Sequence, residues 1–236
     1  MNLMLLFPED FVGENLVQIT GRRCRHMLEV QKVLEGDALR VGLENGAVGE
    51  GRIISLNCDA IRMSVALTEQ PPVPLPLTVL LALPRPKMLK RSLQHLTALG
   101  IKKIILVNTY RVEKSFWQSP WLSASSIQEQ LILGLEQCRD TIMPEVVLEK
   151  RFKPFVEDRL PELMNGKRAL VAHPSGKNAC PRGINEAAVL AIGPEGGFIP
   201  YEVDKLVEVG FEPIHLGPRI LRVETAVTAL VSKLYD

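Results

Sequence analysis

The chain has 236 residues, of which 46% are hydrophobic and 23% charged, and its formal net charge at pH 7 is +1. This length suffices for two modest domains with ordinary buried cores, and the near-neutral balance excludes a chain that is basic throughout. No stretch approaches the roughly 18 apolar residues that a membrane-spanning helix needs.

The N-terminal part has a mainly β pattern. Residues 1–7 are apolar but lack a basic start, and Pro8, Glu9 and Asp10 follow at once, so they predict a first strand and not a signal peptide. Apolar residues alternate over 39–43 and 61–67, and an Asn45-Gly46 hairpin signal follows the first run. Met27, Val30 and Leu34 recur at helical spacing and predict a short helix. These patterns predict a small barrel-like binding domain over residues 1–70.

A proline-rich connector follows this domain. Residues 69–76 hold four prolines in eight positions, which disfavours both helix and central strand. We therefore expect a linker at 71–76 and a second domain over 77–236.

Helical and strand patterns alternate after the linker. Apolar runs predict strands at 77–83, 104–108, 169–172, 187–192 and 212–216, and helical periodicity predicts helices at 88–99, 126–137, 201–209 and 226–234. This order predicts an α/β domain with a mainly parallel sheet. Val227, Leu230, Val231 and Leu234 form one apolar stripe in the last helix, and Thr225 is expected to cap it.

The cysteines and histidines do not form a metal motif. The four cysteines contain no C-x-x-C pair and the four histidines no H-x-x-x-H spacing, so no metal site is expected. Isolated cysteines in a chain without a secretory leader are typical of reduced residues in a cytosolic protein.

Positive charge is concentrated in one stretch. Residues 80–120 carry eight basic residues and one acidic residue, whereas residues 1–70 carry seven basic and ten acidic ones. This concentration favours a polyanionic partner, above all RNA, over a set of solvated surface lysines.

Two glycine-rich turns near the C-terminus suggest a small-ligand site. Gly193-Pro-Glu-Gly-Gly197 follows a predicted strand but matches neither G-x-G-x-x-G nor a G-K-[ST] ending, and Glu195 would repel a triphosphate. The second turn, from Gly217 to Thr225, places two arginines and a glutamate beside Ile220 and Leu221. A purely structural strand-to-helix turn is the alternative for the first of them.

At these turns the chain closely resembles the RsmE family of 16S ribosomal RNA uridine N3-methyltransferases, which belong to the SPOUT class of S-adenosylmethionine enzymes. The matching segments are 25–28, 35–37, 99–101, 136–139 and 144–146, followed by the most specific pair, Gly193-Pro-Glu-Gly-Gly-Phe198 and Leu216-Gly-Pro-Arg-Ile-Leu-Arg222 with Glu224-Thr-Ala226.

The resemblance implies a fold, a cofactor and partners. The first domain would be a PUA-like RNA-binding β-barrel and the second a SPOUT-type α/β domain with a C-terminal trefoil knot, working as a homodimer in the cytoplasm on 16S rRNA of the small ribosomal subunit. S-adenosylmethionine would lie among three loops, whose residues are Ala172, His173, Gly193, Pro194, Glu195, Gly196, Gly197, Leu216, Gly217, Ile220, Leu221 and Arg222.

Candidate residues for catalysis and RNA binding follow from charge and position. Arg222 is expected to hold the uracil or stabilise its anion, with an ion pair to Glu224 or Glu195 as the structural alternative. Glu224 and His173 are candidate general bases, although a Glu before an apolar helix often serves the helix dipole instead. The expected RNA contacts are Arg22, Arg23, Arg25, Arg85, Lys90, Arg91, Arg111 and Arg139.

Two other functions remain open from the sequence. A related SPOUT enzyme could methylate another RNA or another acceptor atom, such as a ribose 2′-hydroxyl, because cofactor motifs do not distinguish acceptors. A non-catalytic RNA-binding assembly factor could keep the fold as a scaffold.

Overall fold

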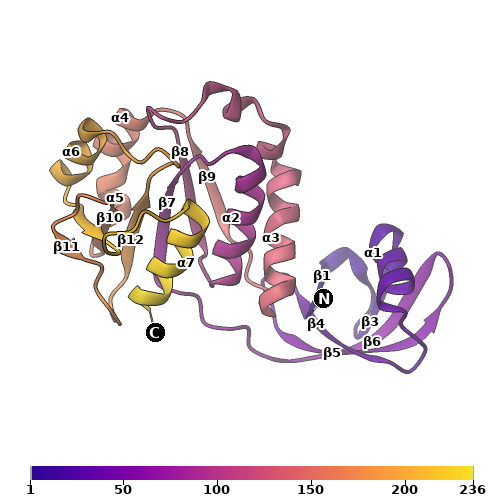
Figure 1. Ribbon diagram of the computed structural model, residues 1–236. Coiled ribbons are helices and arrows are strands. Elements are labelled where there is room, and N and C mark those ends of the chain that lie inside the picture. Colours follow the sequence, from indigo (N-terminus) through magenta and orange to yellow (C-terminus); the bar gives the residue numbers. More distant parts are fainter. Residues whose placement is uncertain (1, 236) are drawn as a thin grey trace. The chain divides into compact units, whose positions relative to one another are not determined.

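The computed structural model describes residues 2–235 and divides into two compact units (Figure 1). The first unit comprises Met1–Val73 and Leu135–Met143, and the second comprises Pro74–Gly134 and Pro144–Asp236. No pattern in the sequence indicated that residues 135–143 join the first unit. Among the described residues, no helix is long and apolar enough to cross a membrane.

The first unit is built on a curled six-stranded sheet in the order β1-β4-β5-β6-β3-β2. Its strands are β1 (Met4–Leu6), β2 (Phe11–Gly13), β3 (Leu16–Thr20), β4 (Ala38–Leu43), β5 (Val48–Leu56) and β6 (Ala60–Glu69). The β1–β4 pair is parallel and the other pairs are antiparallel. Register shifts at Val48/Gly49 and Ile53/Ser55 interrupt the long β5–β6 ladder. Such bulges bend a strand and strengthen its twist, which lets the sheet curl around its core.

One helical segment packs against this sheet. It consists of α1 (Gly21–His26) and a π-helical turn η2 (Met27–Gln31), while a short 3-10 turn η1 (Pro8–Asp10) precedes β2. Cys24 and Met27 face the core and are fully buried. The predicted helix therefore exists, but two of the apolar residues whose spacing predicted it do not face the core: Val30 is 65% exposed and Leu34 67%. The π-turn changes the helical period, so the spacing from Met27 no longer selects one face.

The segment 135–143 is tied into the first unit by hydrogen bonds. The Leu3 amide donates to the Glu136 carbonyl at 3.1 Å, and the Met143 amide donates to Asn45 Oδ1 at 2.9 Å. Glu136 Oε1 accepts a further bond from the Leu5 amide at 3.3 Å. Burial raises the pKa of the Glu136 carboxyl, and the Leu5 hydrogen bond partly opposes this.

The second unit contains a seven-stranded sheet in the order β11-β13-β10-β12-β7-β8-β9, and every pair in it is parallel. The strands are β7 (Leu77–Ala82), β8 (Lys103–Val107), β9 (Glu145–Glu149), β10 (Arg168–Ala172), β11 (Asn178–Ala179), β12 (Ala188–Ile192) and β13 (Glu212–His215). All residues of β7 and β12 are buried, because both faces of a parallel sheet are covered by other elements. The predicted α/β class with a parallel sheet is confirmed.

Helices and short turns connect these strands. They are α2 (Pro86–Ala98), η3 (Lys114–Gln118), η4 (Pro120–Leu122), α3 (Ala124–Cys138), α4 (Phe152–Pro154), η5 (Phe155–Arg159), α5 (Leu160–Met164), α6 (Pro200–Glu208) and α7 (Val223–Leu234). Helices α2 and α7 pack against each other (Figure 1). The apolar stripe predicted for α7 is buried as expected.

One helix cap was predicted wrongly. Thr225 lies inside α7, where it is exposed, and Arg222 is the N-cap residue with extended backbone angles. The helix begins at Val223 because that side chain is already part of the buried stripe, being only 6% exposed. Burial of an apolar side chain outweighs the preference of threonine for a cap, since a cap contributes only about 1 kcal/mol.

Candidate functional site

A cavity of about 400 Å³ lies at the carboxyl ends of three neighbouring strands, β10, β12 and β13. Its wall consists of the segments that leave those strands, together with one side chain from the loop after β8 and three from α7. The lining residues are 172–174, 192–198, 214–221, Arg111, Val223, Ala226 and Leu230. The carboxyl edge of a parallel sheet is where α/β proteins bind ligands, because backbone groups and helix starts converge there.

The structure brings together eleven of the twelve residues predicted to bind the cofactor. All three predicted loops line the cavity, and Arg222 alone of that set is absent from the described lining. Arg222 is exposed at the start of α7, and Glu224 is half-buried in the first turn of that helix. Val223, between these two candidates, does line the cavity.

The first glycine turn is closed by its own backbone. The Gly197 amide donates to the Pro194 carbonyl at 2.7 Å, and Gly197 has a φ of +74°. A Cβ atom on Gly193 would lie 2.9 Å from the Phe198 amide nitrogen, closer than real Cβ contacts. Glycine at these positions therefore lets the main chain itself form the cavity wall.

Two of the predicted RNA-binding arginines belong to segments that touch this turn. The Arg111 guanidinium donates a hydrogen bond to the Gly196 carbonyl, and a Cβ on Gly196 would lie 2.9 Å from Arg111 Cδ. The exposed Glu195 carboxylate accepts a bond from the Arg85 amide at 3.4 Å, at the start of α2. A carboxylate is stabilised there by the positive end of the helix dipole.

A buried carboxylate, not predicted from the sequence, fixes the Arg111 segment. Glu202 is 3% exposed and accepts hydrogen bonds from the Tyr110 amide at 2.7 Å and the Ile199 amide at 3.0 Å. It therefore joins the loop after β8 to the start of α6, directly beside Arg111. The sequence could have indicated this role, because Glu202 lies three residues after the expected N-cap of a helix. A glutamate at that position commonly accepts a hydrogen bond from the N-cap backbone amide.

The second glycine turn combines a positive-φ glycine with exposed apolar side chains. Gly217 has a φ of +114°, and its amide donates to His215 Nδ1 at 3.0 Å. Ile220 is 83% exposed and Leu221 38%. This loop therefore offers an apolar surface at the cavity that nothing in the single chain covers among the described residues.

The hydrogen bonds of His173 restrict its chemistry. Its Nδ1 accepts from the Ser175 amide at 3.3 Å and lies 2.7 Å from Ser175 Oγ. In a neutral ring this arrangement assigns the proton to Nε2, which leaves no free basic nitrogen. The geometry therefore does not favour His173 as a general base.

The remaining predicted RNA contacts differ in their surroundings. Lys90 lies over the Trp121 ring, with 3.3 Å between Nζ and the ring centroid, and Arg91 is exposed. Arg22, Arg25 and Arg139 are exposed, and Arg139 has a left-handed backbone with a φ of +61°.

Arg23 is engaged in structural contacts inside the first unit. It forms a bidentate ion pair with the buried Asp10, donates to the Leu5 carbonyl at 3.1 Å and lies over the Phe7 ring. Both of its terminal nitrogens are used in these bonds, so the structure ties Arg23 to the first unit's own packing.

Comparison with known proteins identifies the class to which this site belongs. A family model described as "RNA methyltransferase domain" matches residues 71–235, and the chain therefore belongs to that family of RNA methyltransferases. More narrowly, curated proteins that match nearly the whole chain are named ribosomal RNA small subunit methyltransferase E, which confirms the predicted resemblance to the RsmE family.

Three of these similar proteins cover nearly the whole chain. "Ribosomal RNA small subunit methyltransferase E" of Treponema pallidum is 28% identical over 236 residues, which is 97% of this chain and 88% of that one. "Ribosomal RNA small subunit methyltransferase E 1" of Borreliella burgdorferi is 27% identical and covers 97% and 95%. The crystal structure of a ribosomal RNA small subunit methyltransferase E from Neisseria gonorrhoeae, bound to S-adenosyl methionine, has a TM-score of 0.75 at 24% identity and covers 98% and 95%.

Proposed function

We propose that this protein transfers the methyl group of S-adenosylmethionine to N3 of a specific uridine in 16S rRNA of the small ribosomal subunit. The observation that carries the proposal is the cavity in which three predicted loops, far apart in sequence, meet at the carboxyl ends of β10, β12 and β13. Its position in an RNA methyltransferase domain, and the activity named for the relatives, support this choice.

The cavity has the chemistry that an adenosyl cofactor needs. Its volume lies within the roughly 300–1,000 Å³ of small-molecule sites. Ile192, Ile214 and Leu230 provide an apolar wall for a flat ring, while the glycine turns expose backbone donors and acceptors to its edge. Glu195 is the one carboxylate in the described lining, and it suits a cationic ligand better than a phosphate.

When bound, the cofactor would supply an electrophilic methyl group on a sulfonium. The residues of this chain would hold the uracil in line with it and stabilise the negative charge left when N3 loses its proton. Arg222 is our candidate for that stabilisation: it is exposed directly after the cavity loop, and the structure records no ion pair for it among the described residues. The predicted alternative, a structural pair with Glu224 or Glu195, is therefore not formed in a single chain.

Glu224 is our remaining candidate for the general base. It is half-buried in the first turn of α7, next to Arg222 and the cavity residue Val223. A carboxylate in the first turn also interacts favourably with the helix dipole, which is the structural alternative to a role as base. The pH dependence of the single-turnover rate of methyl transfer, measured for Glu224→Gln, tests the role. If the variant no longer shows the fall in rate at low pH, the role is supported, and an unchanged pH dependence excludes it.

We further propose that the two units have different functions. The first unit would be a PUA-like barrel that binds RNA, and the second a knotted domain that carries out catalysis. In support of the knot, β10 lies between β12 and β13 in the sheet. The end of α7 also returns to an earlier segment, where the Ile184 amide donates to the Leu234 carbonyl at 2.7 Å. The exposed basic residues Arg22, Arg25, Arg85, Arg91 and Arg139 would contact RNA phosphates.

We also propose a homodimer that works in the cytoplasm, where ribosomal subunits are modified. The support is the exposure of Ile220 and Leu221 on the cavity loop, because apolar side chains beside a functional site are commonly covered by a partner. Sedimentation of Ile220→Asp tests this: a dimer that dissociates agrees with the proposal, and an unchanged mass rejects it.

Calorimetric titration with S-adenosylmethionine separates this function from that of a non-catalytic assembly factor. We expect stoichiometric binding that disappears when Gly193→Val fills the turn, while Gly13→Val in the first unit binds normally. Absence of binding by the wild-type chain would favour the scaffold.

A further inference from the structure

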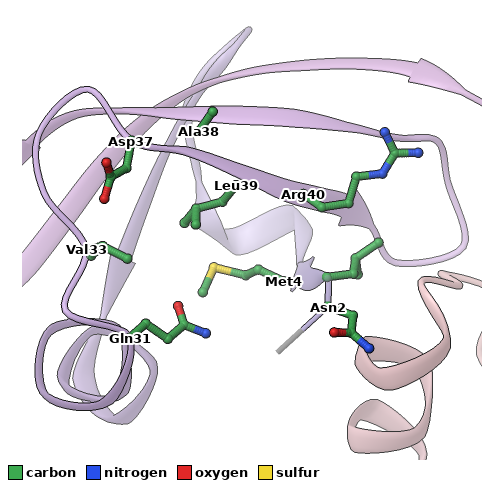
Figure 2. A pocket seen from close by; sticks show the side chains of 9 residues that line it. Asn2, Met4, Gln31, Val33, Asp37, Ala38, Leu39 and Arg40 are labelled. Carbon is green, nitrogen blue, oxygen red and sulfur yellow. The ribbon is translucent and has the colours of Figure 1, made fainter.

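The first unit contains a second cavity, remote in sequence from the glycine turns, of about 430 Å³. It lies between the amino-terminal strand, the end of η2 and the start of β4. Its lining residues are Asn2, Leu3, Met4, Gln31, Val33, Asp37, Ala38, Leu39 and Arg40. Figure 2 shows the side chains of Met4, Gln31, Val33 and Leu39 pointing toward one another across it.

One polar atom of a residue that lines this cavity lacks a partner. Gln31 Oε1 is buried and accepts no hydrogen bond in the structure. A buried acceptor without a donor costs folding free energy, so such atoms are rare in native proteins, and a donor from a bound ligand is one explanation for this atom. The backbone around it is also unusual, because Gln31 ends a π-helical turn and Lys32 follows with a left-handed φ of +54°. Such turns are frequent at functional sites.

The other polar side chains of the cavity are already engaged. Arg40 forms a bidentate ion pair with Glu69, and Asp37 Oδ2 accepts from the Leu34 amide at 2.8 Å. Asn2 Nδ2 donates to the Gln137 carbonyl at 2.8 Å. Among the described lining residues, Gln31 therefore presents an amide whose buried oxygen is unpaired, and Met4, Val33 and Leu39 provide apolar walls. The positive charge of Arg40 is compensated by Glu69, so the cavity is not suited to a phosphate.

These features select a flat, uncharged ring with a donor beside an acceptor. We propose that the cavity receives an unstacked nucleobase of the RNA, and that Gln31 pairs with its edge. Glutamine pairs in a bidentate manner with N6 and N7 of adenine, which makes adenine the expected base. Proteins read single-stranded RNA in this way, by taking unstacked bases into apolar sites and bonding to their edges.

The charge around the helical segment fits the same ligand. Residues 21–32 carry four basic residues and one acidic residue, and Arg22, Arg25 and Lys32 are exposed. Phosphates would lie against these side chains while the base enters the cavity. This inference rests on the proposed function only in taking RNA as the substrate.

Binding of short single-stranded RNA to the full-length protein, measured by fluorescence anisotropy, tests the proposal without any methyl transfer. Oligoadenylate should bind more tightly than oligouridylate, oligocytidylate or an abasic strand of equal length. Gln31→Leu should weaken oligoadenylate binding roughly tenfold and leave the abasic strand unaffected. Lys32→Gln, the control, should weaken all strands alike.

Thermal unfolding of the same variants excludes a merely structural role for Gln31. Because leucine removes an unpaired buried acceptor, Gln31→Leu should be at least as stable as the wild type while binding RNA less well. Equal oligoadenylate affinity of Gln31→Leu and wild type, or no preference of the wild type for bases over the abasic strand, would overturn the proposal. Base-selective RNA binding by a protein that transfers no methyl group would instead reject the proposed function and leave this site intact.

Discussion

At the scale of single residues, the cavity depends mainly on glycines, because they have no side chain. Gly193 and Gly197 let the main chain form its wall, and Arg111 replaces the missing side chain of Gly196 by lying against it. The residue types at the turn were readable from the sequence. The approach of Arg111, 85 residues away, was not, because it depends on the parallel pairing of β7 with β8 and of β7 with β12.

Two glycines with nearly equal φ angles provide a matched test of the turn. Gly197 has a φ of +74° and Gly166 a φ of +72°, and only Gly197 lines the cavity. Alanine at either position should cost about 1 kcal/mol of folding free energy, because a Cβ is strained in this region. Calorimetry should show weaker S-adenosylmethionine binding for Gly197→Ala alone, and equal weakening by Gly166→Ala would contradict the assignment.

Arg222 should affect the reaction without affecting cofactor binding. Because it stands outside the described lining of the cavity, Arg222→Ala should bind S-adenosylmethionine normally. Loss of a group that stabilises developing charge typically lowers kcat by about 10²- to 10³-fold. Single-turnover methyl transfer measures this, with the exposed Arg182→Ala as control. A wild-type rate for Arg222→Ala would exclude the catalytic role.

At the level of elements, the strongest periodic patterns were predicted and the irregular ones were missed. The predicted strands and helices of the second unit are present within a few residues of their expected bounds. Strand β9 and the segment from α4 to α5 were not predicted. That segment contains a π-helical turn and two prolines, Pro154 and Pro161, so it lacks a regular helical period.

The last turn of α3 gives the first unit a pH-dependent stability. Burial raises the pKa of Glu136 above that of an unfolded glutamate, so the folded state binds this proton more tightly. The protonated carboxyl therefore contributes its full stabilisation of the folded state at a pH below the pKa of an unfolded glutamate. This contribution is lost as the pH rises through the raised pKa of the folded state. Glu136→Gln keeps an acceptor for the Leu5 amide and should lack this loss.

Urea unfolding at about pH 4 and about pH 8 compares the two proteins. The variant should gain stability relative to the wild type at the higher pH, and the difference should shrink at the lower one. If the unfolding free energies of the two proteins change with pH in the same way, the pKa of the Glu136 carboxyl is not shifted by folding.

For the whole molecule, charge distribution carries more information than net charge. A formal charge of +1 conceals the basic stretch at residues 80–120. In the structure, two members of this stretch, Arg85 and Arg111, form hydrogen bonds to the first glycine turn. The distribution of charge along the sequence, and not its overall composition, therefore predicted an RNA partner. It could not have predicted a chain crossing such as a knot, because periodicity describes elements and not the path between them.

Removal of this charge should change the salt dependence of RNA binding. Each basic side chain that no longer binds a phosphate reduces the steepness of log K against log salt by roughly 0.7 to 0.9, because fewer counterions are released. Alanine replacement of Arg85, Lys90 and Arg91 together should therefore flatten the slope for small ribosomal subunits, whereas the exposed Lys150→Ala should not. An unchanged slope would remove this stretch from the RNA footprint.

The central claim concerns the atom that receives the methyl group. Small ribosomal subunits from cells that lack this protein should be incubated with it and isotope-labelled S-adenosylmethionine, and the rRNA should then be digested and analysed by nucleoside mass spectrometry. We predict label in 3-methyluridine at one position of 16S rRNA. Label on a ribose 2′-hydroxyl or another base, or no transfer by a protein that binds the cofactor, would contradict the account.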